Sequence, residues 1–390
     1  KKMKLTNNIN FKNFKEKKID KNIQKLLNNL LNKDNDILNS LSKSYKDSWN
    51  KKIKSNYNKY KNVILIGMGG SIMGSRAIYS FLNQIIKKNF FFIDNFEHNK
   101  IKNIKKKNTL NLIISKSGNT LETIVNSNTL LNKNVKNIFI TENKDNYLRS
   151  LAYKLKSEII DHNNYIGGRY SVLSEVGMLP AMLMDLNIKK FRNLNALIKN
   201  KYFMKSLINN VSNVLTLIKK NKSNSVILNY DEKSEDLFYW YQQLIAESLG
   251  KKSNGILPII SKMPQDNHSL MQSYLDGPKN NFYTFFFVKD RSHNNLKNKE
   301  LLESHQYLKS KNLGNILYNQ CVATQNVFKK KKIPFRSFQV EKTDEGSLGE
   351  LFTFFILETI LLGKALKINP YDQPSVELIK IETKKRLLKN

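Results

Sequence analysis

The sequence predicts an α/β protein built from two doubly wound, parallel-sheet domains, with an N-terminal helical arm and a C-terminal helical segment. Short runs rich in β-branched residues alternate with amphipathic stretches, as expected when helices cover both faces of a parallel sheet. The 390 residues exceed the roughly 250–300 that one hydrophobic core holds, so two domains are expected. We place the arm at residues 1–45, the first domain at 46–195 and the second at 196–390.

The arm and the first domain differ in hydrophobic periodicity. In the arm, apolar residues such as Ile23, Leu27 and Leu30 recur at helical spacing. From about residue 61 the pattern changes to short apolar runs, and a glycine-rich turn follows the first of them. The expected strands cover residues 63–66, 90–93, 111–114 and 135–140, and the expected helices cover residues 72–86 and 120–131.

The second domain repeats this alternation from about residue 200, although no internal sequence repeat is evident. The expected strands cover residues 226–228, 281–288 and 335–340, and the expected helices cover residues 236–249, 301–309, 348–365 and a final segment from about 375. The apolar run 351–362 is shorter than the roughly 20 residues that cross a bilayer, and it contains Glu358. We therefore expect a buried helix there.

The formal charge of +34 raises the question of nucleic-acid binding. Lysine and asparagine are spread along the whole chain, and no zinc finger, RNA-binding aromatic motif or basic zipper is visible, so we expect neither nucleic acid nor membrane as a partner. Lysine clusters at 105–107 and 329–332 fall between predicted elements and are interpreted as solvated loops. A single cysteine, Cys321, and a basic N-terminus without an apolar segment favour a cytoplasmic protein.

A first candidate anion site is the glycine-rich turn at residues 67–74, between a predicted strand and a predicted helix. The backbone N–H groups of such a turn, near Gly70 and Ser71, favour an anion, with the helix N-terminus behind them. The turn lacks the third glycine of the dinucleotide fingerprint, because Ile72 stands there. Asp94, after the next strand, keeps a dehydrogenase open as an alternative.

A second candidate site follows the strand at 111–114, at the edge where open α/β sheets bind ligands. Ser115, Ser117 and Thr120 place three hydroxyls there, and Lys116 contributes mostly its backbone N–H. The plainer interpretation is helix capping by Asn119 with Glu122 three residues later, which accounts for only part of the cluster. A phosphate monoester fits the whole cluster better, and this favours a sugar phosphate over a dinucleotide.

The stretch Ser-Lys-Ser-Gly-Asn-Thr-x-Glu-Thr resembles the phosphosugar-binding motif of SIS domains. Four further motifs follow in order along the chain and are similar to signatures of the phosphoglucose isomerase family. They lie at residues 167–174, at 265–269 with Gln272, at 276–278, and in the tail from 369 to 380. The resemblance implies two SIS-type domains, and the length is similar to the compact bacterial members of that family.

The resemblance also implies roles for individual residues. Glu247 matches the general base of the family, and His268 matches the histidine implicated in ring opening. Lys380 matches the lysine on the ring-oxygen side. Arg169 would stabilise the developing enediolate charge, and Gln373 would lie near the phosphate.

Each of these positions has a structural interpretation as well. Glu247 and Lys251 have the spacing of an ordinary helical ion pair, and the histidine lies beside an expected helix start. Lys380 lies on a lysine-rich helix, and Arg169 follows a Gly-Gly turn. Asn267, Ser375 and Ile379 depart from the family pattern, which affects the expected loop geometry more than the chemistry.

The resemblance implies interconversion of D-glucose 6-phosphate and D-fructose 6-phosphate through a cis-enediolate. Such proton transfer requires no organic cofactor, and five histidines with one cysteine form no metal-ligand motif. Family members are dimers, which implies a homodimer with His268 acting across the interface. The alternative is a sugar-phosphate sensor, which would keep the hydroxyl motif but would not need the four catalytic side chains together.

Overall fold

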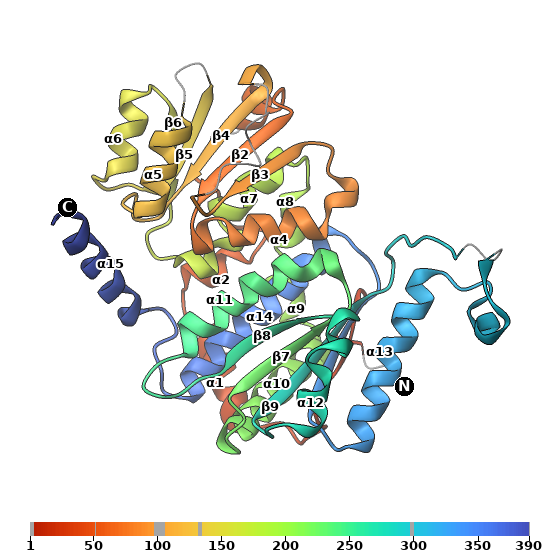
Figure 1. Cartoon of the computed structure of the whole chain (residues 1–390). Coiled ribbons are helices and arrows are strands. Elements are labelled where there is room, and N and C mark those ends of the chain that lie inside the picture. The colour runs from red at the N-terminus through yellow and green to blue at the C-terminus, as the bar shows by residue number, and fades with distance from the viewer. Residues whose placement is uncertain (1–3, 51, 97–105, 132–134, 297–299, 390) are drawn as a thin grey trace.

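The computed structural model describes residues 4–50, 52–96, 106–131, 135–296 and 300–389. It confirms an α/β architecture with two five-stranded sheets surrounded by helices (Figure 1). The first sheet has the order β3-β2-β4-β5-β6, and all its strand pairs are parallel. Its strands are β2 (Asn62–Gly67), β3 (Asn89–Ile93), β4 (Thr109–Ile114), β5 (Lys136–Glu142) and β6 (Glu158–His162).

The second sheet has the order β8-β7-β9-β10-β1. Its strands are β7 (Asn224–Asn229), β8 (Leu257–Lys262), β9 (Asn281–Val288), β10 (Phe335–Val340) and, from the start of the chain, β1 (Ile9–Lys12). The four strands β7 to β10 pair in parallel, whereas β1 runs antiparallel to β10, with Ile9 opposite Val340. The second sheet is therefore parallel apart from one edge strand.

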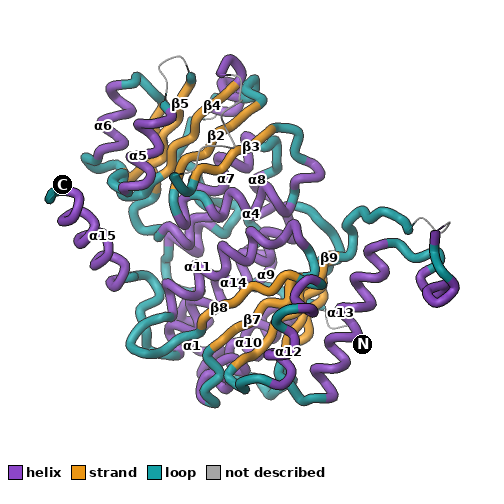
Figure 2. Tube along the Cα trace, in the orientation of Figure 1, coloured by secondary structure: helices purple, strands orange, loops and turns teal. Residues whose placement is uncertain are grey.

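Helices fill the space around and between the sheets (Figure 2). In the first half they are α1 (Lys21–Leu31), α2 (Asp36–Ser40), α3 (Ile53–Tyr57), α4 (Met73–Phe81), α5 (Leu121–Leu130), α6 (Tyr147–Lys154), α7 (Glu175–Leu183), α8 (Ile188–Phe191) and α9 (Leu194–Leu197). In the second half they are α10 (Lys201–Lys219), α11 (Glu235–Leu249), α12 (Met271–Asp276), α13 (Leu313–Lys330), α14 (Glu345–Ala365) and α15 (Pro374–Leu387).

The two sheets share one strand order. In each sheet the first parallel strand of the domain lies between the second and the third, and the fourth follows the third. Helix α4 follows β2 and helix α11 follows β7, and these two equivalent helices pack against each other between the sheets (Figure 1). The chain therefore contains a repeat at the level of the fold that its sequence does not reveal.

The long apolar helix predicted near residues 348–365 is present as α14 and forms part of the core. Within the described part of the chain, α14 is the helix long and apolar enough to cross a membrane, and 94% of its apolar window is buried inside the protein. Glu358, its one carboxylate in the apolar run, forms a fully buried ion pair with Arg336 of β10. Asn210 donates a hydrogen bond to Glu358 and accepts one from Arg336, and the Tyr241 hydroxyl accepts another from Arg336. Both buried charges are therefore paired and hydrogen-bonded.

The N-terminal segment differs from the expected helical arm. Helix α1 is present and packs on α10 and α14, but residues 9–12 form the edge strand β1. In this strand Ile9 and Phe11 are buried, while Asn10 and Lys12 point away from the core, which is the alternation of a half-buried strand. Residues 9–12 thus belong to the second sheet.

Two further expectations are wrong in detail, and several elements were missed. The helix expected at 301–309 is a 3₁₀ segment, Glu303–Leu308, with a kink at His305. Lys329 and Lys330 form the last turn of α13 and not a loop, while residue 105 of the other lysine cluster lies outside the described residues. The elements β6, β8, α10 and α13 were not predicted from the sequence.

Candidate active site

The glycine-rich turn after β2 packs directly on a second loop. Gly69 has φ +52°, and a Cβ there would meet the Gln243 side chain at 2.7 Å. A Cβ on Gly70 would lie 2.1 Å from the carbonyl carbon of Gly168 and 2.5 Å from the backbone nitrogen of Arg169. Gly70 therefore allows the turn after β2 and the loop before Arg169 to touch backbone to backbone, and Gly69 leaves room for the Gln243 side chain.

The second predicted loop follows β4 and forms a compact turn with exposed and buried hydroxyls. Ser115 is buried, and its Oγ lies 3.0 Å from Oγ1 of Thr120. Gly118 has φ +65° and packs against Asn146. Thr120 is the N-cap residue of α5 but makes no capping hydrogen bond, so its hydroxyl remains available to a ligand. A cluster of this kind at a helix N-terminus suits a phosphate.

The capping interpretation of this loop is wrong. Asn119 Oδ1 accepts a hydrogen bond from the backbone N–H of Tyr147, 3.0 Å away at the start of α6. It therefore ties the loop to the next helix and does not cap α5. Lys116 also reaches across the site, because its Nζ donates to the carbonyl oxygen of Asn164 and lies 3.4 Å from a carboxylate oxygen of Glu142.

Glu247 is held on α11 by donors on both carboxylate oxygens. Its Oε2 accepts from Nη1 of Arg169 at 3.1 Å, and its Oε1 accepts from Nε2 of Gln243 at 2.9 Å. The expected helical pair with Lys251 does not form, because that lysine pairs with Asp372 at 2.6 Å. The Glu247 side chain keeps 29% exposure, so the carboxylate is fixed in direction yet open to a ligand.

Arg169 connects three segments of the chain. Its side chain is 2% exposed, and besides Glu247 it donates to Ser248 of α11 at 2.8 Å and to Gln373 at 2.7 Å. It also donates to the backbone carbonyls of Pro370 and of the aspartate two residues later. The guanidinium therefore fixes the C-terminal segment against α11 and places a buried positive charge at the wall of the site.

One cavity of about 410 Å³ unites most of the predicted site residues. Its lining includes, from the prediction, Gly70, Ser71, Lys116, Ser117, Thr120, Arg169, Glu247, Gln373 and Lys380. Ser115 lies just behind this lining, bonded to Thr120. His268, on the 3₁₀ segment Gln265–His268, is exposed and does not line the cavity.

Two lining residues lie outside every motif identified from the sequence: Glu142 and Gln243. Gln243 lies four residues before Glu247 and hence on the same helix face, which is a signal that the sequence does contain. Glu377 pairs with Lys380 at 2.6 Å on the exposed helix α15. Glu142 enters the site only because β5 lies beside β4 in the sheet.

A buried histidine lies behind this site. His162, at the end of β6, has its Nδ1 2.8 Å from the carbonyl oxygen of Asn163. Burial, helped by the nearby positive charge of Lys116, lowers the pKa of His162 to about 4. This imidazole is therefore neutral at physiological pH and adds no charge near the phosphate loop.

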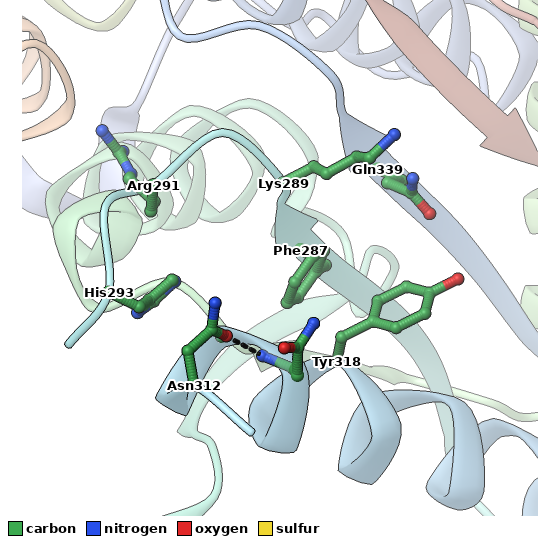
Figure 3. Close-up of a pocket in the computed structure, with 9 residues that line it drawn as sticks. Phe287, Lys289, Arg291, His293, Asn312, Tyr318 and Gln339 are labelled. Atoms are coloured by element: carbon green, nitrogen blue, oxygen red, sulfur yellow. Dashed lines mark hydrogen bonds between the residues drawn. The ribbon is translucent and has the colours of Figure 1, made fainter. Parts of the chain in front are cut away.

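The equivalent position in the second sheet, after β9, also has a cavity, of about 330 Å³ (Figure 3). Its cations already have partners: Arg291 makes a bidentate ion pair with Asp231, and Lys289 pairs with Glu341 at 2.9 Å. Figure 3 shows the Arg291 side chain directed away from the other lining residues. Of these two cavities, the one at the first sheet therefore contains the hydroxyl-rich loop predicted to bind a phosphate. Among the described residues there is no group of three or more metal-ligating side chains.

Two largely parallel sheets, a hydroxyl-rich loop at a helix N-terminus and a carboxylate in the same cavity are the features expected of a sugar-phosphate-binding protein. The family model described as phosphoglucose isomerase matches residues 24–258. A glucose-6-phosphate isomerase of Methanocaldococcus jannaschii is 34% identical, with 82% of each chain covered. The chain belongs to the phosphoglucose isomerase family.

Further relatives agree over nearly the whole length. A glucose-6-phosphate isomerase of Mycoplasmoides gallisepticum is 29% identical, with 96% of this chain and 97% of the relative covered. Among solved structures, a hypothetical protein of Thermus thermophilus superposes with a TM-score of 0.81 at 22% identity, covering 94% of each chain. A glucose-6-phosphate isomerase of Chlamydia trachomatis gives 0.70 at 19% identity, covering 90% of this chain and 77% of that one. These two structures support the fold alone.

Proposed function

We propose that this protein interconverts D-glucose 6-phosphate and D-fructose 6-phosphate by opening the sugar ring and moving a proton between C2 and C1 through a cis-enediolate. One observation carries the proposal: a hydroxyl-rich phosphate loop and the carboxylate of Glu247 line the same cavity. The names of the relatives point to the same reaction. The reaction requires a base next to a carbonyl carbon, and a fixed carboxylate supplies it.

The phosphate of the substrate binds the hydroxyls of Ser71, Ser117 and Thr120, with the N-terminus of α5 adding its dipole. Ser115 orients Thr120 from behind, and Lys116 supplies backbone N–H and positive charge. The phosphate thus anchors one end of the sugar, so that its C1–C2 end extends toward α11. Anchoring at a remote group reduces the entropy that the reacting atoms must lose.

Glu247 then removes the proton from one carbon and returns it to the neighbouring carbon. Hydrogen bonds from Gln243 and Arg169 hold its two oxygens, which leaves the carboxylate one orientation toward the cavity. The buried guanidinium also stabilises the negative charge that grows on the enediolate oxygens. Lys380 and Gln373, from the C-terminal segment, complete the wall on the ring-oxygen and phosphate sides.

Ring opening by His268 requires a second copy of the chain in this proposal. Within one chain His268 is exposed outside the cavity, so the residue has to reach a neighbouring subunit's site. Helix α15 projects from the body and has no buried residue, with Leu378, Ile379 and Ile381 more than half exposed (Figure 1). Apolar side chains left open beside the active site favour a homodimer. We place this homodimer in the cytoplasm.

The base assignment is tested by Glu247→Gln, which keeps the shape of the side chain but removes its basicity. Proton exchange at C2 of glucose 6-phosphate in D₂O, followed by NMR, is expected to slow by about 10²–10⁴-fold. Binding of glucose 6-phosphate, measured by calorimetry, is expected to change little. Glu382→Gln, on the exposed face of α15, is the control and should exchange at the normal rate. A normal rate of proton exchange in Glu247→Gln contradicts the assignment. If the wild-type protein binds glucose 6-phosphate but does not exchange its C2 proton, the protein is a sensor.

The subunit assignment of His268 is tested by mixing two inactive variants, Glu247→Gln and His268→Gln, after dissociation and reassembly. A mixed dimer has one site with both residues intact if His268 acts across the interface. About one quarter of the wild-type rate is then expected, because half of the dimers are mixed and each has one working site. No recovery of activity in a mixture shown to contain mixed dimers contradicts the shared site.

A further inference from the structure

A second cavity, distinct from the candidate active site, lies at the β1–β10 edge of the second sheet. Its volume is about 460 Å³, and it is lined by segments that are far apart in the sequence. Strand β1 and the residues after it supply one wall, the end of α10 a second, and the end of α13 with the start of β10 a third. None of its lining residues lines the active-site cavity.

Six lysines line this cavity: Lys12, Lys15, Lys17, Lys220, Lys329 and Lys332. No carboxylate is among its lining residues, and within the described part of the chain none of the six lysines forms an ion pair. By contrast, the neighbouring Lys331 points elsewhere and pairs with Asp276 at 2.7 Å. We call the cavity lined by these six residues the lysine cavity.

The lysines of this cavity destabilise one another's charge. Burial and the nearby Lys329 lower the pKa of Lys12. Burial and the charge of Lys15 and Lys220 lower the pKa of Lys17, against an opposing effect of Asp20. That aspartate already accepts hydrogen bonds from two backbone N–H groups as the N-cap of α1. Repulsion among unpaired cations in a recess is relieved when an anion with several charges binds.

The ends of two helices explain only part of the cluster. Lysines in the last turn of a helix interact favourably with its dipole, which accounts for Lys220 at the end of α10 and Lys329 at the end of α13. The dipole of a helix does not explain Lys12, Lys15 and Lys17, which lie on or after a strand. A polyvalent ligand is the simplest reason for all three segments to direct lysines into one recess.

We propose that the lysine cavity binds a small oligophosphate, either inorganic tripolyphosphate or the triphosphate chain of a nucleotide. The cavity lies within the roughly 300–1,000 Å³ of typical small-molecule sites, and this volume suits a compact ligand better than a duplex. Thr216 and Asn213 provide polar side chains beside the cations, and Lys17 already donates to Thr216 at 2.9 Å. Phosphate oxygens accept the several N–H donors that ammonium groups offer.

The test is calorimetric titration of the full chain with sodium tripolyphosphate at 150 mM salt. The variant Lys12→Gln/Lys17→Gln/Lys329→Gln is compared with a matched control, Lys136→Gln/Lys154→Gln/Lys189→Gln. The control removes three exposed lysines from other surfaces, so both triple variants have the same net charge. Loss of roughly tenfold or more in affinity is expected for the cavity variant, and less than about twofold for the control.

Each outcome decides the proposal. Equal affinity of both triple variants, or no wild-type binding at this salt concentration, overturns it. ATP bound as tightly as tripolyphosphate supports recognition of the phosphate chain alone, and tighter ATP binding adds a contribution from the nucleoside. A single-stranded oligonucleotide that outcompetes both contradicts a small ligand. Should the cavity variant fail to fold, the single variants Lys12→Gln and Lys329→Gln answer the same question, each with an expected loss of about threefold.

Discussion

Substituting Gly70 by alanine tests the backbone contact that assembles the active site. Gly70 lies in the turn after β2, and its Cα faces the loop that leads into Arg169. An added Cβ would lie 2.1 Å from the carbonyl carbon and 2.3 Å from the carbonyl oxygen of Gly168. Both are backbone atoms, so no side-chain rotation relieves the clash.

The size of the effect follows from these distances. Ordinary van der Waals contact begins at 3.4 Å, so the two loops have to separate by more than an ångström. Overpacking of this kind costs about 1–3 kcal/mol of unfolding free energy. The same displacement moves Arg169, and with it the carboxylate of Glu247, away from the phosphate loop. A misplacement of about 1 Å costs about 10²-fold in rate.

Two measurements check this expectation. Urea denaturation gives the loss of unfolding free energy, and a coupled assay with glucose 6-phosphate gives the loss in kcat. Gly167→Ala is the control for stability, because a Cβ there meets only a ring carbon of Tyr170 at 3.7 Å. Wild-type stability and rate in Gly70→Ala would refute the direct contact between these loops.

Two more predictions concern buried charge. Arg336→Met leaves the carboxylate of Glu358 buried without its partner, so urea denaturation is expected to show a loss of about 3–5 kcal/mol; a loss below about 1 kcal/mol contradicts this reasoning. His162 has a folded-state pKa of about 4, below its unfolded value of about 6.5, so the unfolded state binds the extra proton and stability falls as pH decreases between these values. Relative to wild type, His162→Asn should lose less stability between pH 6.5 and 4.5, by up to about 1.4 kcal/mol per pH unit; parallel curves contradict it.

Much of the fold could be predicted because its strands are strongly apolar. Strands β9 and β10 begin and end at the predicted residues, since aromatic and β-branched side chains make up most of β9 and half of β10. Helix α13 was not predicted, and only Cys321 and Phe328 of its 18 residues are buried. Strand β1 is four residues long, and its role depends on a partner more than 300 residues away.

The candidate site, like the fold, could be predicted from the sequence only where a local motif marks it. The loops after β2 and β4 could be located from local motifs, because glycine and hydroxyl residues carry the signal at each strand end. The partners of Glu247 could not, since Arg169 precedes it by 78 residues and meets it only in the folded chain. The role of His268, which is exposed outside the cavity, depends on a second chain and stays a prediction.

The pairing of β1 with β10 joins two strands that lie more than 300 residues apart in the sequence. Because β1 precedes β10, it is synthesised first and can cover the outer edge of β10 once β10 emerges. Deletion of residues 9–12 would leave the backbone groups of β10 unpaired along that edge. Such a variant would be prone to associate edge to edge through β10.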